Sequence, residues 1–212
     1  ALQALGIRAI CDLRRAEERQ KEPTHWRDNT AHALHWDDQL ELPTLRSYAA
    51  QRPSTAEGMF AAMIDLYRGL PLRMHARIHG LLTCIANDRV PVLVHCAAGK
   101  DRTGVAIAVL LALLDVPRDT IVEDYLLTNE AGNFEQFIRS RQQAQLGLAD
   151  ANHPLLAMPE ELRRVLFSAH ADFLHAAFDA IEHQLGGFDA YVEQTLSIDS
   201  AVRDSVRAKL LA

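Results

Sequence analysis

Cysteine is scarce in this chain of 212 residues, and so are the patterns that would mark a metal site. The three cysteines, Cys11, Cys84 and Cys96, are odd in number and unevenly spaced, which excludes a disulfide framework and a zinc-ligand pattern. His75 and His79 stand four residues apart, but no acidic partner or third ligand accompanies them. We therefore expect no metal and no other cofactor.

The sequence also lacks long apolar runs and an excess of basic residues. No run is long enough to span a bilayer and no signal peptide is seen, so we expect no stable membrane insertion and a cytoplasmic or secreted location. The net charge is −6, and no basic stripe interleaved with aromatic residues occurs, which argues against a nucleic-acid partner. A 49% hydrophobic composition without repeats predicts one core and one domain over residues 1–212. The oligomeric state stays open.

One stretch, residues 91–104, places a strand, a tight loop and a helix start in immediate succession. Val92, Leu93 and Val94 form a short apolar run that suits a buried parallel strand ending near residue 95. From Thr103 the sequence becomes long and apolar, which predicts a buried helix that ends near Asp115. Between strand and helix lies the pattern Cys-x5-Arg, residues 96–102.

The spacing of this pattern has a chemical meaning. Five residues that lead into a helix N-terminus let successive backbone N–H groups converge on one point and bind an anion such as phosphate. The same dipoles favour the thiolate of Cys96, which is then a ready nucleophile. Arg102 supplies a planar, charged fork for two phosphoryl oxygens. The predicted phosphate-binding residues are Ala97, Ala98, Gly99, Lys100 and Arg102.

Other residues of this stretch are expected to support the loop. Gly99 permits a backbone conformation that a Cβ would block, and Gly104 would let the helix start pack closely on the strand. We expect Thr103 to donate its hydroxyl to the Cys96 sulfur and His95 to fix the loop from below.

The form His-Cys-x-x-Gly-Lys-Asp-Arg-Thr-Gly resembles the Cys-x5-Arg phosphatases, above all bacterial tyrosine phosphatases related to the secreted mycobacterial and listerial enzymes. The resemblance implies metal-free hydrolysis of phosphomonoesters through a cysteinyl-phosphate on Cys96. It implies a phosphorylated protein or a phosphoinositide as partner, with phosphotyrosine as the first substrate and dual specificity or phosphoinositide activity beside it. At the position of Lys100 it implies tolerance of multiply phosphorylated head groups.

Shorter stretches extend the resemblance from about residue 5 to the C-terminus: residues 5–14, 17–19, 67–71, 124–129 and 186–188. Members of the family carry a further N-terminal segment with an Asn-Phe-Arg-Asp element, so we expect the natural chain to begin upstream of Ala1. The resemblance also implies that part of residues 129–180 forms a helical lid, although an apolar stripe there fits plain core packing equally well.

The sequence leaves the general acid open. Asp101 would be held near the phosphate whenever the loop forms, so it either protonates the leaving group or only braces Arg102. Asp12, which ends a predicted strand, is a lesser candidate, and a pairing of Asp12 with Arg14 is slightly favoured over direct chemistry. Asp38 is another lesser candidate, although paired surface aspartates usually form a turn.

These observations predict a three-layer α/β fold, with a mostly parallel central sheet flanked by helices and a site at the carboxyl ends of the strands. The expected strands are residues 7–13, 33–36 and 92–95, and the expected helices are 55–67, 72–87, 103–114, 118–127, 130–146, 160–185, 188–196 and 200–211. A phosphatase is the favoured function. The alternative is a catalytically weak phosphate-recognition module that keeps the loop, and a rhodanese-like sulfur carrier is less favoured because of the Arg-Thr ending.

Overall fold

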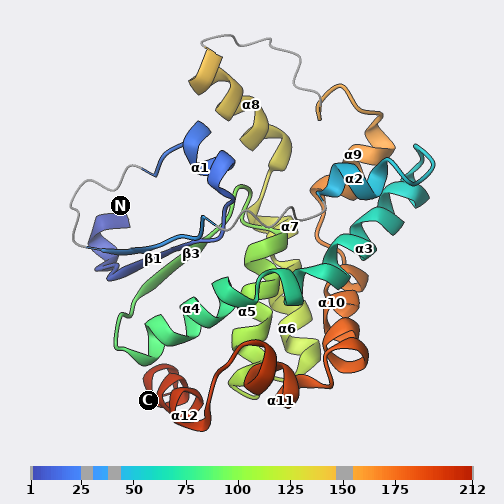
Figure 1. The fold of residues 1–212 in the computed structure, drawn as a ribbon. Helices are drawn as coiled ribbons and strands as arrows, with labels where there is room; N and C mark the ends of the chain where they lie inside the picture. The colour runs from blue at the N-terminus through green and yellow to red at the C-terminus, as the bar shows by residue number, and fades with distance from the viewer. Residues whose placement is uncertain (1, 25–30, 38–43, 147–154, 212) are drawn as a thin grey trace.

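The computed structural model describes residues 2–24, 31–37, 44–146 and 155–211, and the side chains of residues 2, 3 and 141–146 are not described. Three strands form one sheet in the order β2-β1-β3: β1 (Ala9–Asp12), β2 (His32–Leu34) and β3 (Val92–His95). Both pairings are parallel. Helices make up most of the remaining described chain, so the prediction of an α/β fold built on a parallel sheet is confirmed (Figure 1).

The register of the sheet brings two strand ends level with each other. Asp12 of β1 lies opposite His95 of β3, and the Leu13 N–H donates to the His95 carbonyl at 2.8 Å. All four residues of β1 are buried, as expected for the central strand of a parallel sheet. The residues that follow β1 and β3 therefore emerge side by side at one edge.

The helices account for most of the predicted segments. Their bounds are α1 (Ala16–Lys21), α2 (Leu45–Ala49), α3 (Ala56–Arg73), α4 (His75–Ala86), α5 (Asp101–Leu113), α6 (Arg118–Leu126), α7 (Thr128–Ala131), α8 (Phe134–Leu146), α9 (Glu160–Phe167), α10 (Ala171–Gln184), α11 (Phe188–Ala190) and α12 (Ser200–Leu210). A short 3-10 helix, η1 (Leu2–Leu5), precedes the sheet, and a π-helical segment, η2 (Tyr191–Thr195), follows α11.

The predicted break at residues 69–71 was wrong, because α3 continues through Pro71 and ends at Arg73. Pro71 removes one N–H donor from the helix, but Leu70 and Pro71 are buried and the Met74 N–H still donates to the Leu70 carbonyl at 2.9 Å. The Pro71 carbonyl accepts from the Tyr191 hydroxyl at 2.9 Å. Tertiary packing thus outweighs the local helix-breaking signal.

The single helix predicted over residues 160–185 is divided into α9 and α10, and the segment 130–146 is interrupted at Gly132. The first division has a visible cause. Asn129 bonds both backbone groups of Ala169, donating to its carbonyl at 2.9 Å and accepting from its N–H at 2.7 Å. Ala169 is therefore paired outside the helix, and its neighbour Ser168 adopts an extended backbone.

The core lies between the sheet and the helices. Helix α10 packs on α3, α12 packs on α4, and α4 and α5 contact the sheet. The largest fully buried side chains include Tyr67, Tyr191 and Phe173. Among the described helices, none is long and apolar enough to cross a membrane.

Candidate active site

The loop of residues 96–102, called the 96–102 loop below, connects β3 to α5 as the sequence predicts. Gly99 has φ +73°, a left-handed conformation that favours glycine, and its N–H donates to the Cys96 sulfur at 3.2 Å. Cys96 is only 7% exposed. The loop therefore curls back on the buried thiol, and the Gly99 amide faces the Cys96 sulfur.

Two of the expected supporting contacts are different in the structure. Thr103 Oγ1 is buried and has no hydrogen-bond partner in the described part of the chain, so the predicted bond to the Cys96 sulfur was wrong and the Gly99 amide takes that place. Gly104 does not make room for the strand. A Cβ there would lie 2.8 Å from the ring of Tyr125, so glycine is required by α6.

His95 braces the loop from the strand side. Its Nδ1 lies 3.2 Å from the Cys96 carbonyl, and its Nε2 lies 3.8 Å from Asp12 Oδ2. His95 thus lies between the Cys96 carbonyl and the Asp12 carboxylate, and its supporting role stays a prediction.

Arg102 is held by a carboxylate that the sequence did not single out. Its Nη1 and Nη2 donate to Oε2 and Oε1 of Glu18 at 2.6 and 2.8 Å, and Nη1 also donates to the Leu13 carbonyl at 3.4 Å. The Nε–H has no partner within the described residues. Nε and the second N–H of Nη2 are therefore available for two phosphoryl oxygens, while Glu18 fixes the adjacent edge formed by Nη1 and Nη2.

Glu18 is ionised by this contact. Burial raises the pKa of its carboxyl, but the hydrogen bonds and the positive charge of Arg102 outweigh burial and hold that pKa at about 2. The charges of residues 15–21 predict a solvated helical turn, and a helix, α1, does form there. In the structure Glu18 of α1 is instead partly buried against the 96–102 loop.

Asp101 lies at the start of α5 and is fixed through one oxygen. Its Oδ1 accepts from the Tyr67 hydroxyl at 2.7 Å and lies 3.0 Å from Lys100 Nζ. Its side chain is 28% exposed, and the residue lines a cavity together with Ala97 and Ala98. Asp101 is therefore both restrained and accessible, and it is not bonded to Arg102.

Lys100 lines the same cavity, but its ammonium group is directed at acceptors of the protein itself. Its side chain is 3% exposed, and Nζ donates to the carbonyls of Leu166 and Ser168 at 2.8 and 3.2 Å in addition to the contact with Asp101. An ammonium group has three N–H donors, and these three acceptors account for all of them. The expectation that Lys100 presents a charge toward a second phosphate therefore finds no open donor in this arrangement.

Asp12 forms the pair with Arg14 that the sequence favoured. Arg14 Nε donates to Oδ1 at 2.8 Å and Nη2 to Oδ2 at 2.6 Å, and both residues are buried. Burial raises the pKa of Asp12, but these hydrogen bonds outweigh it and the pKa is lowered. Asp38, the other candidate acid, lies outside the described residues.

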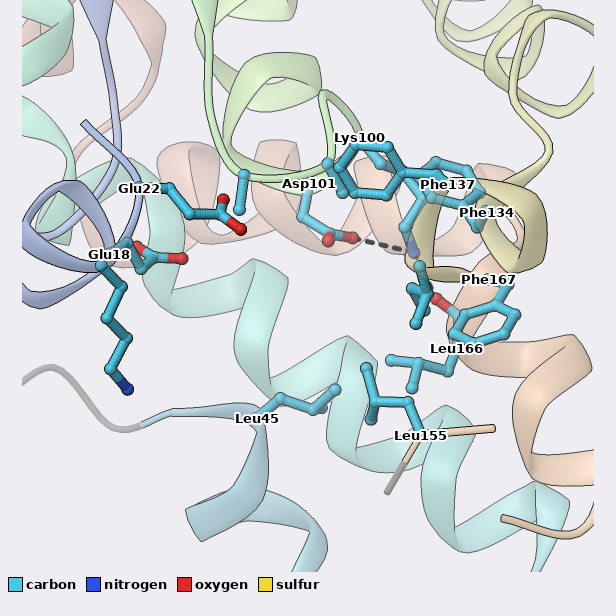
Figure 2. Close-up of a pocket in the computed structure, with 14 residues that line it drawn as sticks. Glu18, Glu22, Leu45, Lys100, Asp101, Phe134, Phe137, Leu155, Leu166 and Phe167 are labelled. Carbon is cyan, nitrogen blue, oxygen red and sulfur yellow. Dashed lines mark hydrogen bonds and ion pairs between the residues drawn. The ribbon is translucent and has the colours of Figure 1, made fainter. Parts of the chain in front are cut away.

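The cavity beside the loop measures about 700 Å³ and has two unlike walls. Figure 2 shows the carboxylates of Glu18 and Glu22 on one side and the rings of Phe134, Phe137 and Phe167 on the other. The aromatic wall comes from α8 and the end of α9, within the segment for which a lid was predicted. Helix α10 of the same segment belongs to the core. Whether α8 closes as a lid stays a prediction.

The reactive groups at this edge are thus a thiol, a guanidinium and a carboxylate. Among the described residues, no group of three or more His, Cys, Asp or Glu side chains is placed to hold a metal ion. Burial raises the pKa of the Cys11 thiol to about 12, and Cys11, Cys84 and Cys96 are all free cysteines. Glu18, Tyr67 and Tyr125 are site residues that no chemical pattern in the sequence indicates. They lie in stretches that carry the family resemblance, which was the one signal that could have found them.

Comparisons with known proteins agree with this geometry. A family model described as the tyrosine phosphatase family matches residues 1–212. A Cupriavidus necator protein named "Putative tyrosine-protein phosphatase" is 31% identical over 208 residues, which cover 94% of this chain and 69% of that protein. The triple specificity protein phosphatase PtpB of Mycobacterium tuberculosis is 32% identical over 156 residues, covering 70% of this chain and 54% of the relative. A tyrosine-protein phosphatase of Nostoc commune is 30% identical over 134 residues, 60% of this chain and 42% of that protein.

Proposed function

The chain belongs to the tyrosine phosphatase family, and from the geometry of its 96–102 loop we propose that it hydrolyses phosphomonoesters, phosphotyrosine foremost, through a cysteinyl-phosphate intermediate. The observation that carries the proposal is the joint placement of Cys96, the loop amides and the open edge of Arg102. A thiolate needs an anion site directly in front of it to attack phosphorus, and these groups provide one.

The reaction proceeds in two balanced steps. In the first, the Cys96 sulfur forms a bond to phosphorus while the bond from phosphorus to the ester oxygen breaks, and Asp101 gives its proton to the departing oxygen. In the second, water attacks phosphorus, its proton passes to Asp101, and the bond from sulfur to phosphorus breaks to release phosphate. Arg102 and the amides hold the equatorial oxygens in both steps, and as charge spreads they bind more tightly.

The cavity favours an aromatic leaving group. The rings of Phe134, Phe137 and Phe167 give a phenol ring an apolar surface next to the loop (Figure 2). The polar inositol ring of a phosphoinositide would not pack favourably on this apolar wall. To bind a second phosphate, Lys100 would have to give up one of its carbonyl partners. We therefore place phosphotyrosine ahead of phosphoinositides.

Phosphoserine, phosphothreonine and phosphoinositide hydrolysis form the second candidate. The observation that favours it is the relative PtpB, whose name states triple specificity. A panel of phosphotyrosine, phosphoserine and phosphothreonine peptides and phosphoinositide vesicles ranks the substrates. A higher kcat/KM on the vesicles than on the phosphotyrosine peptide would reverse our order.

The decisive variant is Cys96→Ser. A serine hydroxyl in the same loop stays protonated and is a poor nucleophile, so turnover of an aryl phosphate should fall by at least about 10⁴-fold while phosphate binding persists. Wild-type turnover should be inhibited by vanadate. Cys84→Ser, which removes a buried thiol of α4, is the matched control and should keep its activity. Phosphate binding without turnover in the wild type would instead indicate a recognition module.

A further inference from the structure

Two buried tyrosines connect the core to Asp101. The Tyr67 hydroxyl of α3 lies 2.7 Å from Asp101 Oδ1 and 2.6 Å from the Tyr125 hydroxyl of α6. Tyr67 is 0% exposed and Tyr125 is 4% exposed. An ionised carboxylate accepts hydrogen bonds but cannot donate them. The Tyr67 hydroxyl therefore donates to Asp101 Oδ1, and the Tyr125 hydroxyl donates to the Tyr67 oxygen.

Both hydroxyls remain protonated, since burial raises the pKa of each phenol well above its ordinary value. Phenylalanine would fill the same volume without burying a polar group, which costs free energy unless it is hydrogen-bonded. Packing alone therefore does not require the Tyr67 and Tyr125 hydroxyls, and what they add to the core is their hydrogen bonds.

The donors converge on one oxygen of Asp101. Tyr67 and Lys100 both face Oδ1, at 2.7 and 3.0 Å. A proton on Asp101 is consequently favoured on Oδ2, since Oδ1 is already occupied as an acceptor. We propose that Tyr67 and Tyr125 are positioning residues that reserve Oδ2 of Asp101 for proton transfer to the leaving group; the inference rests on the proposed phosphatase reaction.

The Lys100 end of the network is anchored on the end of α9 and the turn that follows it. Lys100 donates to the carbonyls of Leu166 and Ser168. The turn is itself fixed, because Asn129 bonds both backbone groups of Ala169. Asp101 Oδ1 is thus held from two directions, by Tyr67 of α3 and by Lys100, which is itself bonded to this segment.

Tyr67→Phe tests the inference through the leaving group. Phenyl phosphate needs an acid because an ordinary phenoxide departs, whereas 4-nitrophenyl phosphate hardly needs one. We expect kcat/KM of Tyr67→Phe to fall about tenfold on phenyl phosphate and less than about twofold on 4-nitrophenyl phosphate. In an Asp101→Asn background the same change should add no further loss. Tyr191→Phe, which removes another buried hydroxyl bonded to α3, should leave the substrate ratio unchanged.

Equal losses on both substrates in Tyr67→Phe would overturn the inference and assign the tyrosines to packing. Tyr125→Phe leaves Tyr67 bonded to Asp101 but removes the donor behind it, so a smaller loss in the same direction is expected. It decides the question if Tyr67→Phe does not fold. If Asp101→Asn shows no leaving-group preference, the inference falls with the acid assignment, while turnover that depends on Cys96 would still support the proposed function.

Discussion

Asp12 and Asp101 both lie near the carboxyl ends of the parallel strands, yet they differ in how many of their oxygens are bonded within the protein. Both oxygens of Asp12 are bonded by Arg14, and its side chain is only 7% exposed. Asp101 is bonded through one oxygen, and its side chain is 28% exposed and borders the cavity. A carboxylate with all its acceptors occupied holds structure, whereas one with a free, accessible oxygen can exchange a proton.

Of the variants that distinguish the two carboxylates, Asp101→Asn should change turnover the most. Loss of the general acid should lower kcat on phenyl phosphate by about 10²-fold or more and change 4-nitrophenyl phosphate far less. The comparison predicts that Asp12→Asn, measured as the folded protein with the same two substrates, shows no such preference. A leaving-group preference in Asp12→Asn and none in Asp101→Asn would exchange the two roles.

Asp12→Asn should instead act on stability. Removing one partner of a buried ion pair leaves Arg14 without its counter-charge and typically costs on the order of 3 kcal/mol. The lowered pKa of Asp12 means that its contribution is present at neutral pH and is lost as the pH falls below the ordinary range of an aspartate. Urea unfolding at pH 7 and at pH 3 measures both effects, and the difference from the wild type should shrink at pH 3.

Asp204→Asn, at an exposed position of α12, provides the matched control and should change the free energy of unfolding by less than about 0.5 kcal/mol. An equally small change in Asp12→Asn would show that the pair with Arg14 contributes little, and the contrast between the two aspartates would then rest on exposure alone.

The sequence predicted the parts of the site that are local in the chain. Residues 91–104 place the strand, the loop and the helix start in one stretch, so Cys96 and Arg102 could be assigned from spacing and residue type. The pairing of Asp12 with Arg14 is also local. Contacts between distant segments could not be predicted: Glu18 lies 84 positions from Arg102 and Tyr67 lies 34 from Asp101.

Lys100 shows why residue type alone misleads at this site. A lysine in a phosphate loop suggests a free charge, but here the ammonium is buried because backbone carbonyls of a segment 66 and 68 positions away satisfy it. In the same way, Pro71 suggested a helix end that core packing overrides. Where tertiary partners decide, the local pattern gives the wrong answer for a physical reason.

The smallest effect is expected from Glu18→Gln. This variant tests whether α1 belongs to the scaffold, like Asp12, or to the active site, like Asp101. Helix α1 follows the strand that carries Asp12, but its Glu18 bonds Arg102 of the 96–102 loop. A neutral amide cannot hold both guanidinium nitrogens as acceptors, so Arg102 should lose its fixed orientation. We expect KM for an aryl phosphate to rise about tenfold with a smaller change in kcat.

The pH dependence separates this positioning role from a merely structural one. Because the pKa of Glu18 is about 2 in the folded protein, its carboxylate should hold Arg102 throughout the range in which the enzyme is assayed, and its contribution to stability should disappear only as the pH falls from about 4.5 toward 2. Glu17→Gln, an exposed neighbour on the same helix, is the control and should leave KM unchanged. A loss of stability in Glu18→Gln with an unaltered KM would place α1 with Asp12, as part of the scaffold, and would mean that the loop alone orients Arg102.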